Sequence, residues 1–265
     1  MPAEAISPAG GTVKVGRDGP VTILTLSYPE RRNALSLPLR AVLLEVLQAA
    51  MEDETCRAVV LTGEGEHFCS GGDISSFDGV TAVSGRLRMQ RVHPIVRLIV
   101  RGEKPVIAAV EGAAAGAGLC VAASCDMVVA GKGAKFSCTF NMIGLLPDFG
   151  AAWALPARMG LGRAKMMMMS GRALGAEAAE RAGLAELVTE TGGALKAALE
   201  LAHDVAKAAP LSNGFVKAVL ARGPLPLEEM LGAEADAQGV LYASEDFQEG
   251  RRAFLEKRKP EFRGR

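Results

Sequence analysis

The fold is decided by one stretch near the middle of the chain, Val106-Ile107-Ala108-Ala109-Val110-Glu111-Gly112-Ala113-Ala114-Ala115-Gly116-Ala117-Gly118. Its first five residues are all apolar, which predicts a buried strand. Its three glycines let the backbone approach a ligand closely. An Ala-rich segment follows and predicts a helix that runs to about Ser124. The first N–H groups of such a helix have no intrahelical acceptor and carry partial positive charge, so this turn is a candidate anion site.

Strand and helix patterns alternate on both sides of this stretch. Further strands are predicted at Val21–Leu26, Ala58–Thr62, Met127–Ala130 and Lys135–Ser137. Helices are predicted at Leu37–Met51 and Leu87–Val100, with a turn-like segment from Pro29 to Ser36. From Gly150 onward the pattern is almost entirely helical. This order predicts an α/β fold with a helical C-terminal part, divided into residues 1–200 and 201–265.

Composition excludes several classes of protein. The 265 residues are 49% apolar, and 30 basic residues balance 30 acidic ones, which argues against a general nucleic-acid binder. Five cysteines without a C-x-x-C pair, and only three histidines, argue against a disulfide framework or a zinc site. No apolar run is long enough to cross a bilayer, and Met1 to Gly11 lack a secretory signal pattern. We therefore expect a cytoplasmic protein without a membrane partner.

A second Gly-rich segment, Phe68-Cys69-Ser70-Gly71-Gly72-Asp73, also follows a predicted buried strand. Two such loops could aim two backbone N–H donors at one oxyanion, which is what thioester enolate chemistry requires. Two alternatives compete. A dinucleotide site needs G-x-G-x-x-G, but Gly116-Ala117-Gly118 is followed by Leu119-Cys120-Val121 and lacks the third glycine. Both loops could also be tight turns without a ligand.

The motifs together resemble the crotonase, or enoyl-CoA hydratase/isomerase, superfamily. The resemblance rests on the order and spacing of these segments: Glu30 to Ser36, Phe68 to Ile74, Lys104 to Gly112, Gly116 to Gly118, Cys125-Asp126, Gly144-Leu145-Leu146-Pro147-Asp148 and Phe254 to Pro260. It implies a spiral core of repeated ββα turns, with C-terminal helices that drive assembly of homotrimers, often paired into hexamers. It implies an acyl-CoA thioester as the substrate. No metal or separate cofactor is implied, since coenzyme A is part of the substrate.

The resemblance also implies roles for individual residues. Ser70 and Ala117 would supply the oxyanion-hole N–H groups, and alanine is tolerable at 117 if its φ is negative. The substrate-binding positions would be Arg31, Arg32, Ala34, Ser70, Gly71, Gly72, Asp73, Ile74, Gly116 and Phe140. Either Lys257 or Lys259 in the tail would touch the phosphates of coenzyme A, from a neighbouring subunit.

The choice of reaction depends on carboxylates near the acyl group. The two glutamates of family hydratases align with Cys120 and Phe140, which cannot act as carboxylate bases. Family isomerases often carry an acid after the proline of the segment that ends in Pro147-Asp148. One carboxylate there can move a proton from C2 to C4, and apolar neighbours would raise its pKa. The structural alternative is that Asp148 caps the helix that begins near Gly150.

The sequence therefore favours an enoyl-CoA isomerase, or an isomerase of a related acyl-CoA, that uses Asp148. A hydratase with a reduced carboxylate set is the main alternative. A CoA-ester-binding oligomer without turnover is the second. The acyl chain length is not fixed by the sequence, because pocket depth depends on how the segment from Ser75 to Gly85 folds.

Overall fold

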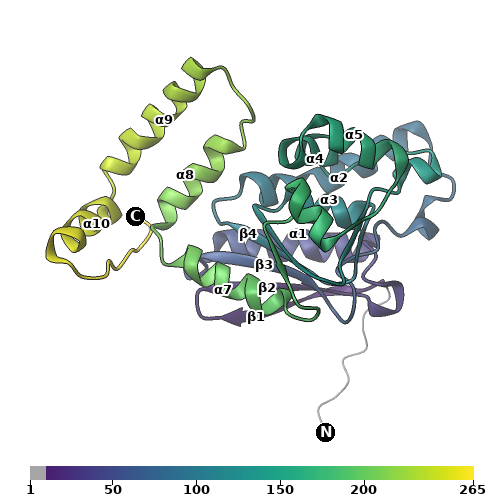
Figure 1. The fold of residues 1–265 in the computed structure, drawn as a ribbon, viewed down its shortest axis with the longest axis horizontal. Coiled ribbons are helices and arrows are strands. Elements are labelled where there is room, and N and C mark those ends of the chain that lie inside the picture. The colour runs from purple at the N-terminus through teal and green to yellow at the C-terminus, as the bar shows by residue number, and fades with distance from the viewer. Residues whose placement is uncertain (1–9) are drawn as a thin grey trace, which may run out of the picture.

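The computed structural model describes residues 10–265 (Figure 1). The expectation about a signal at Met1 to Gly11 concerns mainly residues 1–9, which lie outside the described range. The main sheet has six strands in the order β1-β2-β3-β4-β6-β9. Their bounds are β1 Thr12–Asp18, β2 Val21–Ser27, β3 Ala58–Gly63, β4 Val106–Val110, β6 Met127–Gly131 and β9 Leu187–Thr189. Only the β1–β2 pair is antiparallel.

The structure also contains a second, small sheet. It consists of β5 (Ala113–Ala115), β7 (Lys135–Ser137) and β8 (Leu174–Gly175). The chain thus runs from β4 in the first sheet to β5 in the second and then into helix α3 (Ala117–Ser124). The next turn repeats this with β6, β7 and a short 3-10 helix, η3 (Phe140–Ile143). This is the predicted α/β core of ββα turns, and the predicted fold class is confirmed.

Apolar helices cover both faces of the main sheet. Helix α7 (Ala194–Ala206) places Ala194, Ala198 and Ala202 against one face, where Val60 and Ile107 also lie. The opposite face packs on a larger core, to which α1 (Leu37–Glu52), α2 (Ala82–Arg101) and α3 contribute. Strands buried on both faces explain the nearly continuous apolar runs in the sequence. The remaining helices of the core are α4 Ala151–Met159, α5 Leu161–Ser170 and α6 Ala176–Ala182.

Three C-terminal helices project from the core as an arm (Figure 1). They are α8 Pro210–Leu220, α9 Leu227–Tyr242 and α10 Glu245–Glu256. A buried ion pair anchors α8, because the ammonium of Lys217 donates to Asp126 Oδ2 and to the carbonyl of Lys104, each at 2.7 Å. This contact gives Asp126 a structural role. The tail folds back on the arm, where the buried carboxylate of Asp246 accepts the N–H groups of Arg263 and Gly264.

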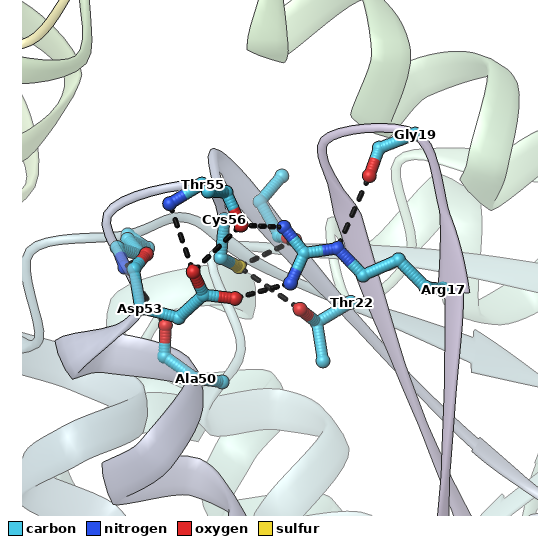
Figure 2. Close-up of polar contacts among 9 residues, drawn as sticks. Arg17, Gly19, Thr22, Ala50, Asp53, Thr55 and Cys56 are labelled. Atoms are coloured by element: carbon cyan, nitrogen blue, oxygen red, sulfur yellow. Dashed lines mark hydrogen bonds and ion pairs between the residues drawn. The ribbon is translucent and has the colours of Figure 1, made fainter.

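The edge strand β1 is tied to the end of α1 by a polar cluster (Figure 2). Arg17 forms an ion pair with Asp53 and donates to the carbonyl of Gly19 at 3.1 Å. Hydrogen bonds from Thr55 and Arg17 hold the pKa of Asp53 well below its usual range. Below them the Thr22 hydroxyl donates to Cys56 Sγ at 3.2 Å. These contacts fix the β1–β2 hairpin, far from the Gly-rich loops.

The sequence pattern missed some elements. Strands β1, β5, β8 and β9 were not predicted, and α2 begins at Ala82 rather than Leu87. Thr81 starts α2 through a reciprocal capping box with Ser84. The predicted division at residue 200 falls inside α7, so the two-part division stays a prediction. Over residues 10–265, no helix is both long and apolar enough to span a membrane.

Candidate active site

The first Gly-rich loop is held between two other segments. Parallel bridges join Cys69 to Ala114 of β5 and Gly72 to Leu35. The carbonyl of Gly71 accepts the N–H of Leu35 at 2.7 Å, and the carbonyl of Cys69 accepts the N–H of Ala115 at 2.9 Å. The sequence-predicted segments 31–34 and 70–73 are therefore brought together, directly beside the second Gly-rich loop.

The second loop meets the first at very close range. Gly116 is the N-cap of α3 with a φ of 51°, and Ala117 is the first helical residue. A Cβ on Gly118 would lie 2.4 Å from the carbonyl oxygen of Cys69, so only glycine fits there. Gly71 has a φ of 113°, and a Cβ on it would lie 3.6 Å from the backbone nitrogen of Ala117. The residues around Gly71 and the start of α3 thus face one another at contact distance.

Within residues 10–265, two backbone N–H groups at this junction have no acceptor, and one of them is not the group that the sequence predicted. The N–H of Ser70 donates to the carbonyl of Arg32 at 2.9 Å, and its hydroxyl donates to the carbonyl of Arg31 at 3.0 Å. Ser70 therefore has no free donor for an oxyanion. Across residues 10–265, no acceptor is found for the N–H of Gly72 or of Ala117. Ala117 begins a helix, where an unpaired N–H is expected, and its φ is not positive.

Asp148 lies just before α4, on a loop turned by two left-handed residues, Phe149 and Gly150. Its Oδ1 is buried without a hydrogen-bond partner among the described residues. Burial raises the pKa of Asp148 to about 6, although Arg40, its own backbone N–H and Arg88 act in the opposite direction. The helix-cap alternative is wrong, because Gly150 is the N-cap of α4 and no side chain caps this end.

Asp148 lines a cavity of about 860 Å³ between α2, the 3-10 helix η2 (Ile74–Phe77) and the segment 143–152. The walls are mostly apolar, which suits an acyl group. The apolar side chains are Ile74, Phe77, Val80, Met89, Ile143, Leu145, Leu146, Pro147 and Phe149. Within the described part of the chain, the ionisable residues of this lining are Arg88, His93 and Asp148, so Asp148 is its sole carboxylate.

Two arginines near Asp148, Arg40 and Arg88, were not predicted from the sequence as part of the site. Arg40 is 7% exposed, donates from Nε to the carbonyl of Leu35 at 2.8 Å, and stacks its guanidinium 5.4 Å from the Phe149 ring centre. Burial, and then repulsion from Arg88, lower the pKa of Arg40. The signal was available, because Arg40 precedes Leu43 and Leu47 at the helical spacing of buried positions.

The other predicted substrate-binding residues are distributed as follows. Arg31 and Arg32 are exposed beside Ser70, and Ala34 is buried behind them. Asp73 caps η2 by accepting the N–H of Ser75 at 3.1 Å. Ile74 is 61% exposed at the cavity. The ring of Phe140 would lie 4.0 Å from a Cβ on Gly116, so it borders the second loop.

Lys257 lies apart from these residues within one chain. It is the C-cap of α10, at the end of the arm, and α10 is well separated from α2, α3 and α4 (Figure 1). A contact between Lys257 and a ligand of this site would therefore have to come from another copy.

The positions of the two hydratase glutamates hold no base. Cys120 is fully buried, its thiol donates to the carbonyl of Gly116 at 3.0 Å, and burial raises its pKa well above the usual range. Phe140 is buried as well. His67 braces the loops, because its Nδ1 accepts the N–H of Ala113 at 3.2 Å. Among the described residues, no cluster of three His, Cys, Asp or Glu side chains could hold a metal.

Comparison with known proteins agrees with this geometry. The profile of the family "Enoyl-CoA hydratase/isomerase" matches residues 16–265. The chain is 36% identical over 250 residues to 1,2-epoxyphenylacetyl-CoA isomerase of Escherichia coli K12, which covers 92% of this chain and 95% of the relative. It is also 36% identical over 252 residues to 2,3-dehydroadipyl-CoA hydratase of the same organism, covering 95% and 98%.

A solved structure supports the same assignment. The crystal structure of an enoyl-CoA hydratase from Polaromonas sp. JS666 superposes with a TM-score of 0.89 at 35% identity, over 95% of this chain and 100% of the other. Since both the family profile and these relatives span nearly the whole chain, it belongs to the enoyl-CoA hydratase/isomerase family of the crotonase superfamily and is an acyl-CoA enzyme.

Proposed function

We propose that this enzyme shifts the double bond of an enoyl-CoA thioester, or isomerises a related acyl-CoA, with Asp148 as the proton shuttle. One observation carries the proposal. Asp148 is the sole carboxylate in the described lining of the cavity, and its pKa of about 6 suits a general base at neutral pH. The named relatives act on an aromatic epoxide and on a dicarboxylic chain, so their names do not fix the acyl group.

The reaction needs one base and one oxyanion site. The Asp148 carboxylate removes a proton from C2 of a 3-enoyl thioester, and the electrons of that C–H bond move onto the thioester oxygen. The N–H groups of Gly72 and Ala117 stabilise this oxyanion, in place of the pair Ser70 and Ala117. The protonated Asp148 then returns the proton at C4. The double bond moves from C3–C4 to C2–C3, and no atom is gained or lost.

The rest of the substrate is assigned to the loops around these donors. In this proposal Arg31, Arg32 and Ala34, with the segment 70–74, hold coenzyme A, and Lys257 reaches its phosphates from a neighbouring copy. The arm would assemble a homotrimer or a hexamer. Coenzyme A enters with the substrate, and no metal or further cofactor takes part. Five free cysteines suit the reducing cytoplasm.

Hydration remains the second candidate, because relatives of this chain carry the name hydratase. It is weaker in mechanism, since adding water needs a group that positions the water as well as one that moves its proton. Cys120 and Phe140 offer no carboxylate for this. Thioester binding without turnover is the third candidate, and the buried Oδ1 of Asp148, which finds no partner among residues 10–265, argues against it.

The test is the conversion of 3-hexenoyl-CoA to 2-hexenoyl-CoA, followed by the absorbance of the conjugated thioester. Asp148→Asn keeps the shape of the side chain and removes the base, so kcat should fall about 100- to 10,000-fold. Tm should change little, since the side chain has no hydrogen-bond partner to lose on Oδ1.

Asp78→Asn is the matched control, because Asp78 is exposed at the end of η2 and outside the cavity lining. It should keep the wild-type rate. If the protein hydrates crotonyl-CoA rapidly and Asp148→Asn leaves that rate unchanged, the function is hydration and not isomerisation. Tight binding of both thioesters without turnover of either would favour the binding protein.

A further inference from the structure

We propose that Arg88 selects acyl groups that end in a carboxylate, so that this enzyme prefers CoA thioesters of dicarboxylic acids. The inference rests on the proposed function in one respect only, namely that the acyl group enters the cavity beside Asp148. It goes further by naming the class of acyl group and the residue that recognises it.

The cavity has a cationic group where an ordinary fatty acyl pocket needs none. Among residues 10–265, the side chains that line the cavity are apolar except for Arg88, Asp148 and the exposed His93. In the proposed reaction Asp148 is occupied with the protons at C2 and C4. Arg88 affects that chemistry only by favouring the charged form of Asp148, and a half-buried cation gains nothing from a purely apolar chain beside it.

The guanidinium of Arg88 is held in place but incompletely paired. Nη1 donates to the carbonyl of Ser76 and Nη2 to its hydroxyl, both at 2.8 Å. The guanidinium also stacks over the Phe77 ring, 4.7 Å from its centre. Two of its five N–H groups are thus used, while the buried Nε has no acceptor among residues 10–265. A pre-positioned guanidinium with open donors matches a carboxylate, which can accept two parallel hydrogen bonds.

Two arginines and two aspartates carry charge near the cavity. Arg40 lies behind the lining, and its strongest charge interaction is repulsion from Arg88, ahead of its attraction to Asp148. At pH 7.5 Asp148, with its pKa of about 6, is ionised and offsets one of the two arginines. Asp73 is ionised as well, because the N–H and the hydroxyl of Ser75 donate to its carboxylate and lower its pKa. The preference for a terminal carboxylate therefore rests on the open donors of Arg88 and not on a surplus of positive charge.

The decisive measurement compares two saturated thioesters that bind but cannot react by this route, hexanoyl-CoA and adipyl-CoA. Their acyl chains have six carbons each and differ only in ending with a methyl group or a carboxylate. Calorimetry at pH 7.5 on the wild-type protein should give a Kd about 10- to 100-fold lower for adipyl-CoA, as expected for a charge-assisted hydrogen bond. Equal affinity, or tighter binding of hexanoyl-CoA, would overturn the inference.

Three variants assign the preference to Arg88. Arg88→Met keeps the length of the side chain and should reduce the preference to about twofold or less, while hexanoyl-CoA still binds. Ser76→Ala removes the anchoring hydroxyl but keeps the charge, so most of the preference should remain. Arg91→Met, an exposed position three residues along α2 and outside the lining, should change nothing. A preference that survives in Arg88→Met would also overturn the inference.

These outcomes separate the inference from the proposed function. If wild-type protein binds hexanoyl-CoA without preferring adipyl-CoA, the carboxylate selection fails and isomerisation stands. If it binds neither thioester, the assignment of the cavity to an acyl group fails, and the proposed function fails with it.

Discussion

At the residue scale, the chemistry depends on opposing influences on one carboxylate. Burial raises the pKa of Asp148, while Arg40 and Arg88 favour its charged form, and the outcome is a pKa of about 6. A base with this pKa is largely ionised at neutral pH and still binds a proton well. An unshifted aspartate would be ionised too, but it would be a much weaker base.

This balance predicts the pH dependence of the reaction. The reactive form of Asp148 is the carboxylate, so kcat/KM for 3-hexenoyl-CoA should rise with pH, reach half its maximum near about pH 6 and level off by about pH 8. Below about pH 5 it should fall nearly tenfold per pH unit. Initial rates at constant ionic strength, with circular dichroism to verify folding at each pH, provide the measurement. A half-maximum near pH 4 would mean that the base is exposed to solvent or is another group.

The oxyanion donors can be tested one N–H at a time. Ala117 is the first residue of α3, a position where helices accept proline because its N–H has no intrahelical partner. Ala117→Pro should therefore remove the proposed donor and leave the helix largely intact. We expect kcat to fall about 100- to 1,000-fold, as for other lost oxyanion donors.

Ala117→Gly is the matched control for this change, since it keeps the N–H and should retain most of the rate. Tm of both variants should be compared, because Ala117 is buried and the proline ring needs space. A folded Ala117→Pro protein with wild-type kcat would exclude this N–H from catalysis.

At the element scale, the site exists because two loops and a helix start approach within contact distance. The carbonyl of Cys69 lies where a side chain at residue 118 would have to be. Gly118→Ala should push α3 away from the first loop and cost about 1–3 kcal/mol, the usual range for overpacking. For a chain of this size that corresponds to a fall in Tm of about 2–12 °C. The rate should also fall, since the two donors would separate.

Gly162 is a suitable comparison for that substitution. It lies in α5, is exposed, and a Cβ there would meet nothing within 4 Å. Gly162→Ala should leave the rate unchanged and raise Tm slightly, because alanine favours helix. If Gly118→Ala behaved like Gly162→Ala, the close approach would not be needed for the site.

How far the sequence predicts this site differs from residue to residue. The central strands β2, β3, β4 and β6 and the two Gly-rich loops were predictable, because buried parallel strands are continuous apolar runs and glycines mark close approach. The choice between Ser70 and Gly72 was not, because it depends on which N–H the carbonyl of Arg32 already uses. The spacing of Arg40 to Leu43 and Leu47 indicates a buried position, but its place beside Asp148 depends on tertiary packing. Strand β1 escaped prediction for a similar reason, since it is an exposed edge strand with weak alternation.

At the scale of the whole molecule, the arm leaves apolar surface that a single chain does not cover. Phe254 is 83% exposed and Leu255 is 65% exposed on α10, which is unusual for side chains of this size. The exposed apolar residues of the arm also include Val216, Leu220, Leu227, Leu231, Val240 and Tyr242. The arm contacts its own core mainly through α8 (Figure 1). A second copy that packs on this surface would bury it.

This arrangement predicts a concentration-dependent assembly that the arm controls. Wild-type protein should sediment as a trimer of the 27.6 kDa chain, about 83 kDa, or as twice that mass. Phe254→Glu combined with Leu255→Glu should shift it towards the monomer, because burying two charges at an apolar contact is unfavourable. The core should remain folded, since neither side chain is buried in it. Arg251→Glu on the same helix changes an exposed residue that forms no ion pair with residues 10–265, and it should leave the mass unchanged. A wild-type monomer at micromolar concentration, or a double variant that still forms trimers, would show that α10 does not hold the copies together.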